Sequence, residues 1–503
     1  MKKSGFIWFA LFIFVGAFLS GCTDSAPSGP TPGLGSVSVT KYVAIGNSLT
    51  AGYQSNGLYA SAQIYSYPKM ISQQLVKAGA VLDTFQQPLY GDPGNADPGP
   101  GPNTGKSQRY VILNFTDPKN PVIGPEGKAA GIPLNSTLAR PYDNLGIPGI
   151  PIASFLDSVT TPAAGFGPLV LRSSALGKSI FKQVQTLKKA GAAPDLVTFW
   201  LGANDVLGYA TSGGTVKNPF NNTADPTPGD VFAFLYKQAL DSLRSALPNA
   251  KIVVATIPNV GSVPFFTTVG PKMAAGIKAA KAVNSAIVGL FYQKHGEVVA
   301  SSFTNFDNPA NTPLITLKAS TYAALLGDTT GRWYSDNGIT TLPANINTKQ
   351  PFGFHPQNPF PDALVLDSAE QAVAAKAVLD FNAAITASAA ADGAALFDAY
   401  SFFSNVAKNG YSVAGEVYTA AYISGGLFSL DGVHPSSRGY AIIANQYINT
   451  MNAKFGMNVP LVSLANIPGI PTPLGKYVAG SHIVPTISPD AWKSFDALWG
   501  SGN

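Results

Sequence analysis

Two short segments, far apart in the chain, carry side chains suited to nucleophilic chemistry. The first is GNSLTAGY at residues 46–53, where Ser48 follows directly after an apolar, β-branched run. Ser48 therefore lies at the carboxyl end of a predicted strand, which is the edge where open α/β sheets bind their ligands. The simpler alternative is a strand-to-helix connection in which Ser48 or Thr50 only caps the next helix.

The second segment is DGVHP at residues 431–435, which spaces Asp431 and His434 three apart in a turn before a predicted helix. This spacing lets the carboxylate reach one imidazole nitrogen and leaves the other nitrogen facing outward. A serine is a weak nucleophile until a base takes its proton, and the base needs a third group to fix its tautomer. Taken alone, the segment is better explained as a polar turn in which Asp431 caps the helix.

Two further segments could stabilise a developing negative charge. In LGANDV at residues 201–206, Asn204 follows a predicted strand, and its side-chain amide can donate a hydrogen bond to an oxyanion. In NLGIPG at residues 144–149, Gly149 allows the backbone to approach a ligand closely with its N–H free.

Strand-like and helix-like segments alternate along the chain and predict the elements that position these residues. We expect strands at 36–46, 194–202, 251–258 and 394–400, and helices at 67–79, 171–191, 229–247, 271–291 and 368–393. This alternation predicts an α/β fold with a parallel sheet and helices on both faces. Residues 91–143 and 301–365 are rich in Gly, Pro and Asn and are predicted to be long loop insertions. Residues 37–453 then form one domain, and residues 454–503 an irregular extension packed on it.

The composition limits the classes of function. Hydrophobic residues make up 46% of the 503 residues and charged residues only 12%, so the chain can bury a large core and is not a polar disordered protein. The net charge of +5 includes Lys2 and Lys3, and no basic cluster occurs elsewhere, which argues against a nucleic-acid partner. Four scattered histidines and one cysteine offer no metal-ligand cluster, so no metal is expected.

The N-terminus has the features of an export signal. Lys2 and Lys3 precede an apolar run at 5–19, which is short for a membrane span and typical of a signal peptide. The run ends in LSGC at 19–22, which resembles the lipobox of bacterial lipoproteins; Cys22 is the only cysteine. The resemblance implies a signal peptide over 1–22 and lipid attachment at Cys22, with the membrane as a partner. Thr23 is not acidic, which favours the outer membrane, and residues 23–36 form a flexible tether. The alternative is an ordinary signal peptide with an incidental cysteine.

The segments GNSLTAGY, NLGIPG, LGANDV and DGVHP resemble, in this order, the four sequence blocks of the GDSL/SGNH hydrolase family of esterases and lipases. The resemblance covers roughly residues 37–453 and implies a flavodoxin-like, three-layer α/β/α fold. It implies Ser48 as nucleophile, His434 as general base and Asp431 as the acid that orients it. It also implies an oxyanion hole formed by the backbone N–H groups of Ser48 and Gly149 with the Asn204 side chain. One position departs from the family, because Asn47 stands where the first block has aspartate.

The expected function is a membrane-anchored serine esterase or lipase that works through an acyl-enzyme and needs no cofactor. Apolar segments at 261–269 and 420–430 favour an ester with an acyl chain, and Phe265, Leu427 and Phe428 are candidate pocket residues. Because adjacent side chains point apart, at most one of Phe265 and Phe266 is expected in the pocket. Two alternatives stay open: an O-acetyl esterase acting on polysaccharide, and a non-catalytic surface lipoprotein that uses the fold for binding.

Overall fold

The computed structural model describes residues 31–95, 105–214, 225–294, 297–302, 306, 312–470 and 482–498. The predicted signal peptide with Cys22 lies outside the described residues, as do parts of the tether, of both insertions and of the C-terminal extension. Within the predicted tether, Gly33 exchanges two backbone hydrogen bonds with Asn458, of 3.1 and 2.8 Å, which fixes this part of the tether to the body.

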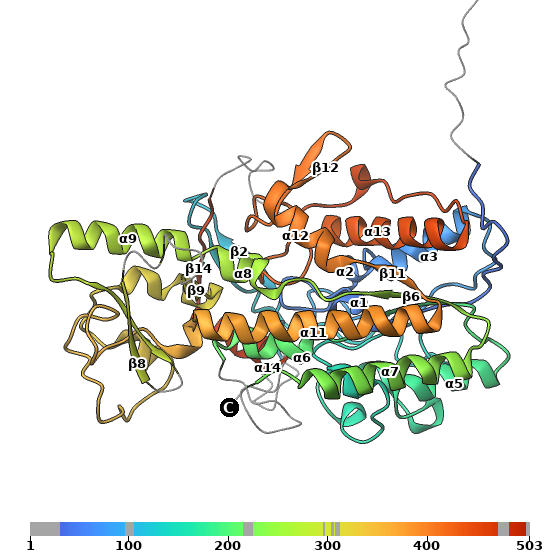
Figure 1. Ribbon diagram of the computed structural model, residues 1–503, viewed down its shortest axis with the longest axis horizontal. Helices are drawn as coiled ribbons and strands as arrows, with labels where there is room; N and C mark the ends of the chain where they lie inside the picture. The colour runs from blue at the N-terminus through green and yellow to red at the C-terminus, as the bar shows by residue number, and fades with distance from the viewer. Residues whose placement is uncertain are drawn as a thin grey trace, which may run out of the picture.

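A five-stranded parallel sheet forms the centre of the molecule (Figure 1). Its strands lie in the order β11-β6-β5-β1-β4, which is the 2-1-3-4-5 order of flavodoxin-like sheets and confirms the predicted fold class. Nearly every strand residue is buried, as expected of parallel strands covered on both faces. The strands are β1 (Tyr42–Gly46), β4 (Asn144–Gly146), β5 (Leu196–Trp200), β6 (Lys251–Ala255) and β11 (Ala395–Phe397).

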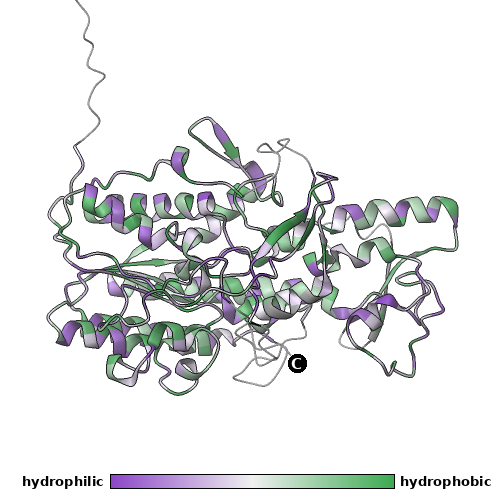
Figure 2. Cartoon of the chain, turned by 180° about the vertical axis from the view of Figure 1, so that it is seen from behind, coloured by the Kyte–Doolittle hydropathy of each residue, from purple (hydrophilic) through white to green (hydrophobic). Residues whose placement is uncertain are grey.

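Helices cover both faces of this sheet (Figure 1). One face carries α3 (Tyr67–Lys77) and α13 (Ser437–Phe455), which meet through the stacked rings of Tyr67 and Tyr447, 4.9 Å apart. The other face carries α5 (Ile180–Lys189), α7 (Gly229–Ala246) and α11 (Ser368–Asp392). The rings of Phe232 on α7 and Phe381 on α11 stack at 4.0 Å. Most of these helices carry hydrophilic as well as hydrophobic residues (Figure 2), as expected of helices that bury one side.

The longest helix, α11, has clear start and stop signals. The Asp367 side chain accepts from the N–H of Glu370, and the Glu370 side chain accepts from the N–H of Asp367, which is a capping box. The helix ends at Gly393, whose φ of 74° suits a residue without a side chain.

The predicted insertions contain regular elements of their own. The first holds the antiparallel pair β2 (Tyr110–Asn114) and β3 (Val122–Pro125), to which β14 (Thr486–Ile487) adds in parallel. Helix α9 (Gly270–Val283) and the hairpin of β7 (Gly289–Lys294) and β8 (Glu297–Ser302) lie mostly before the second insertion and belong to a lobe beyond the end of the sheet (Figure 1). The other short elements are α1 (Ser48–Ala51), α2 (Ala60–Gln63), α4 (Gly167–Leu171), α6 (Asn204–Thr211), α8 (Pro264–Thr267), β9 (Leu314–Ile315), α10 (Arg332–Asp336), β10 (Val365–Leu366), α12 (Ala399–Asn409), β12 (Tyr411–Val413), β13 (Glu416–Tyr418) and α14 (Pro489–Ala497).

Two predicted helices differ in extent from the structure. The helix predicted at 171–191 begins only at Ile180, because Gly177, with φ of 109°, interrupts the chain and Ser179 caps the new start. The helix predicted at 271–291 ends at Val283, because residues 289–294 pair with β8 as a strand. Within the described residues, no helix has the length and apolarity needed to cross a membrane.

The C-terminal segment folds back onto the domain through an aromatic cluster. Phe265 on α8 stacks on Phe495 of α14 at 5.4 Å and meets the edge of Trp492 at 5.7 Å. Tyr110 of β2 donates its hydroxyl hydrogen bond to the carbonyl of Ala491. Helix α14 therefore joins the first insertion to the segment that follows β6.

We predict that Phe265→Ala lowers the free energy of unfolding by about 3–5 kcal/mol, because it empties a fully buried aromatic site. Urea unfolding followed by circular dichroism measures the change. The matched control is Phe234→Ala on α7, whose side chain is 65% exposed and whose loss should change stability by less than about 0.5 kcal/mol. Equal effects of the two substitutions would contradict the packing role of Phe265.

Candidate active site

Ser48 lies immediately beyond the carboxyl end of β1, where α1 begins. Strand β1 lies between β4 and β5, the point in a flavodoxin-like sheet where the strand order reverses and ligands bind. The cap of α1 is Asn47, whose side-chain oxygen accepts from the N–H of Leu49 at 3.1 Å, and not Ser48 or Thr50. The side chain of Asn47 thus does what an aspartate oxygen could do at this position.

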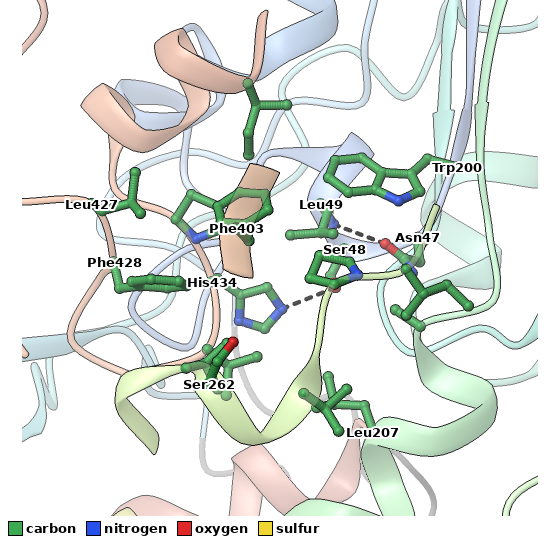
Figure 3. Close-up of a pocket in the computed structure, with 18 of the residues that line it drawn as sticks. Asn47, Ser48, Leu49, Trp200, Leu207, Ser262, Phe403, Leu427, Phe428 and His434 are labelled. Carbon is green, nitrogen blue, oxygen red and sulfur yellow. Dashed lines mark hydrogen bonds between the residues drawn. The ribbon is translucent and has the colours of Figure 1, made fainter. Parts of the chain in front are cut away.

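The structure brings Ser48, His434 and Asp431 into one hydrogen-bonded line. Figure 3 shows the bond between Ser48 and His434. The Nε2 atom of His434 lies 2.9 Å from Oγ of Ser48, and its Nδ1 atom lies 3.1 Å from Oδ2 of Asp431. Ser48 and His434 are 386 residues apart in the chain, so only the fold makes this contact. All three side chains are buried, and Asp431 has no exposed surface.

The carboxylate of Asp431 is held by four donors. Oδ1 accepts from the N–H groups of Val433 and His434 at 2.9 and 2.8 Å, and Oδ2 accepts from the N–H of Asn56 at 2.9 Å as well as from the imidazole. Burial alone would raise the pKa of Asp431, but His434 and the backbone donors outweigh burial and hold that pKa below its usual value. The cap of α13 is Ser436, which accepts from the N–H of Gly439, so Asp431 is not the helix cap.

The candidate oxyanion-hole residues lie at the same edge of the sheet. Gly149 follows β4, which pairs with β1, and has a φ of +83°; a side chain there would collide with the carbonyl of Leu498. The N–H groups of Ser48 and Gly149 donate to no acceptor among the described residues. Asn204 begins α6, lines the same cavity as Ser48 and donates from Nδ2 to the carbonyl of Ile150 at 2.9 Å. This bond ties the segment containing Gly149 to the end of β5.

A cavity of about 70 Å³ opens beside Ser48 and His434 (Figure 3). Leu427 and Phe428 line it, as predicted, and most of the other lining side chains are apolar. They include Leu49, Trp200, Leu207, Ile257, Val260, Val263, Phe403, Val406, Val433 and Ile443.

The prediction that Phe265 lines this pocket is wrong. Phe265 is buried against the aromatic rings of α14, as described above, and Phe266 lines a different cavity next to α9. The backbone of Phe265 has another role, because its N–H donates to the carbonyl of Gly432 at 2.9 Å and supports the turn between Asp431 and His434.

Asp205, which was not predicted from the sequence, braces the segment that follows Gly149. Its Oδ2 accepts from the N–H of Ile152 at 2.8 Å, and its Oδ1 accepts from the hydroxyl of Thr227 at 2.9 Å. Burial raises the pKa of Asp205 to about 7, so this carboxyl changes charge near neutral pH. Its position directly after Asn204 was the only signal available in the sequence.

Across the described residues, no group of three His, Cys, Asp or Glu side chains is arranged to hold a metal ion. The line of Ser48, His434 and Asp431 can act by general base catalysis, since the base contacts both the nucleophile and the group that orients it.

Solved structures with low sequence identity resemble the chain only weakly. One, described as a GDSL-like lipase from Parabacteroides merdae, is 11% identical; it covers 83% of this chain and 98% of its own, with a TM-score of 0.31. An extracellular lipase from Streptomyces rimosus is 13% identical and covers 82% of this chain and 99% of its own, with a TM-score of 0.29. A family 3 carbohydrate esterase from Clostridium thermocellum is 17% identical and covers 50% of this chain and 70% of its own, with a TM-score of 0.20. No curated protein shows significant similarity to the chain.

The family to which the chain belongs is shown by its match to a family model and not by the solved structures. Residues 42–306, just over half of the chain, match the family described as GDSL-like Lipase/Acylhydrolase. The matched residues include Ser48, Gly149 and Asn204, and the fold adds Asp431 and His434 from outside them. The chain therefore belongs to the GDSL-like lipase/acylhydrolase family of hydrolases.

Proposed function

We propose that the protein is a serine ester hydrolase that forms an acyl-enzyme at Ser48. The observation that carries this proposal is the line from Ser48 Oγ through His434 to Asp431, with distances of 2.9 and 3.1 Å, beside an apolar cavity. The family supports hydrolysis, and the geometry supports this particular mechanism.

In the first half of the reaction, Oγ of Ser48 attacks the ester carbonyl carbon and its proton passes to Nε2 of His434. The tetrahedral intermediate then expels the alcohol, which takes the proton from His434 and leaves the acyl group on Ser48. In the second half, a water attacks the acyl carbon and gives its proton to His434, and the acid leaves with Oγ reprotonated. Asp431 stays ionised throughout and stabilises the imidazolium, which agrees with its lowered pKa.

Negative charge develops on the carbonyl oxygen in both halves. The N–H groups of Ser48 and Gly149 and the amide of Asn204 are the donors that we assign to it, because all three lie at the carboxyl edge of neighbouring strands. Donors fixed before the reaction stabilise such a charge without reorganising.

The cavity favours an ester with an acyl chain over an acetyl ester. Its lining is mostly apolar, so a longer chain would bury apolar surface against Leu427, Phe428 and Trp200 that an acetyl group is too short to cover. Polysaccharide deacetylation is the second candidate, and the chain-length prediction below decides between the two.

Substitution of Ser48, His434 and Asp431 is the first test. Ser48→Ala is expected to abolish hydrolysis of p-nitrophenyl esters, and His434→Ala should come close to the same loss because the two residues act as a unit. Asp431→Asn should lower kcat strongly as well, since it disturbs the tautomer of His434. Circular dichroism checks that each variant is folded. A folded Ser48→Ala variant with most of the wild-type rate would overturn the proposal.

Chain-length preference is the second test. For the wild-type protein, kcat/KM should rise from acetyl to medium-chain esters by up to about fourfold per methylene, the equivalent of about 0.8 kcal/mol. Phe428→Ala should flatten this rise more than it lowers acetate hydrolysis, because it removes one wall of the cavity. The matched control is Phe352→Ala, a buried ring that packs on Phe360 outside the cavity lining and should leave the slope unchanged. A wild-type preference for acetate would favour deacetylation instead.

We also propose that the enzyme is exported and anchored to a bacterial outer membrane through lipid on Cys22. The support is the sequence alone: two lysines, an apolar run and LSGC in the order of a lipoprotein signal. Several acyl chains together would bind a membrane firmly, where one chain binds only marginally.

Cys22→Ser is expected to move the protein from the detergent-rich to the aqueous phase in phase partitioning, with the specific activity of the folded enzyme unchanged. Mass spectrometry of the mature N-terminus checks the lipid directly. An unmodified N-terminus on the wild-type protein would contradict the anchor.

A further inference from the structure

A two-residue turn after the nucleophile has an unusual backbone. Ser55 and Asn56 have φ values of 49° and 57°, a region that residues other than glycine seldom adopt. The flanking residues Gln54 and Gly57 exchange two backbone hydrogen bonds, both 3.1 Å long. Two successive positive φ angles between such a pair are typical of a type I′ turn, where Asn-Gly is the least strained choice. Here the first of the two positions is a serine.

We propose that this turn is the positioning device that fixes the carboxylate of Asp431, and that Ser55 and Ser429 are positioning residues for the hydrolysis. The inference rests on the proposed function, because it assigns roles to residues that act through Asp431 and His434.

Among the residues that the structure describes, the turn supplies the one donor to Asp431 that comes from outside its own segment. The N–H of Asn56 donates to Oδ2 at 2.9 Å, and Oδ2 is also the oxygen that faces Nδ1 of His434. The two donors to Oδ1 come from Val433 and His434. Because the imidazole itself has to be oriented by Oδ2, the Asn56 N–H is the donor that holds this oxygen independently of His434.

Two reciprocal hydrogen bonds clamp the turn to the catalytic segment. The N–H of Ser55 donates to Oγ of Ser429 at 2.8 Å, and the N–H of Leu430 donates to Oγ of Ser55 at 3.2 Å. Ser55 and Ser429 are buried, so water does not compete for these bonds. The two bonds join positions 374 and 375 residues apart in the sequence, and the second reaches Leu430, directly before Asp431.

Other polar groups of the turn also accept hydrogen bonds. The side-chain oxygen of Asn56 accepts from the hydroxyl of Tyr53 at 3.0 Å, and the Tyr53 ring lies 4.8 Å from the imidazole of His434. The carbonyl of Ser55 accepts from the N–H of Tyr110 at 2.6 Å, which joins the turn to β2. The turn thus contacts the acid and the first insertion directly, and it reaches the base through Tyr53.

The strain at Ser55 is the observation that points to function. Glycine would adopt the same φ without strain, but it would lose the oxygen that holds the N–H of Leu430. Backbone strain of this kind persists when the surrounding structure requires the geometry, and it concentrates at active sites.

The experiment compares Ser55→Gly and Ser429→Ala with Ser320→Ala in the full-length protein. Ser55→Gly relieves the backbone strain at this position, which stabilises the fold, and removes the oxygen that accepts from the N–H of Leu430, which destabilises it. Because the two effects oppose each other, the melting temperature should change little. We expect kcat of both clamp variants to fall by about ten- to a hundredfold with KM nearly unchanged, because a small displacement of Asp431 misaligns His434. Ser320 is a buried serine whose Oγ has no partner among the described residues, so its substitution should leave kcat unchanged.

A merely structural clamp would lower the melting temperature and leave kcat per folded molecule intact. Wild-type kcat in folded Ser55→Gly or Ser429→Ala would therefore overturn the inference, even if Ser48→Ala is inactive and the proposed function holds. An active Ser48→Ala variant would overturn the proposed function instead. If Ser55→Gly fails to fold, Ser429→Ala alone decides through the same split between kcat and KM.

Discussion

The ionised carboxylate of Asp431 is the group on which the rest of the site depends. It is entirely buried, and an unpaired charge in such a place costs several kcal/mol. Four N–H donors, three of them from the backbone, offset that cost and keep its pKa low. Because the folded-state pKa lies below the unfolded one, Asp431 stabilises the fold above the usual carboxyl pKa and loses this contribution as pH falls through its own lowered pKa.

The sheet explains why distant segments meet at this carboxylate. Parallel strands end at one edge, so the segments after β1, β4 and β5 bring Ser48, Gly149 and Asn204 together although they lie far apart in the chain. The segment with Asp431 and His434 comes from the start of α13, whose packing on α3 fixes its position against β1. The C-terminal helix α14 completes the arrangement, because the carbonyl of Leu498 lies against Gly149 and its aromatic residues support α8. A substitution in α14 can therefore displace the segment that contains Gly149.

The sequence predicted the parts of this structure that depend on periodicity and on short motifs. The parallel sheet, most helices, the meeting of Ser48 with His434 and Asp431, and the lining by Leu427 and Phe428 all agree with the structure. The features that the sequence did not predict depend on contacts between residues far apart in the chain. Phe265 was placed in the pocket because it follows a strand, but its ring packs on Phe495, 230 residues later. Hairpin β7–β8 escaped prediction for a similar reason, since an alanine-rich helical pattern runs up to it and only strand pairing ends the pattern.

The physical cost of the site also bears on the alternative of a non-catalytic binding protein. Binding an apolar ligand in this cavity would need the walls formed by Phe428 and Trp200, and it would gain nothing from a charged carboxylate behind the imidazole. Replacing a buried ion pair with apolar groups of similar volume is often neutral or stabilising, so a binder would be better served by such a core. The site instead holds a buried carboxylate with four donors and a base 2.9 Å from a serine hydroxyl, next to a strained turn that supplies one of the donors. These features destabilise the fold and would not help an apolar ligand to bind, whereas proton transfer between Ser48 and His434 requires them. This is why the geometry favours a hydrolase over a binding platform.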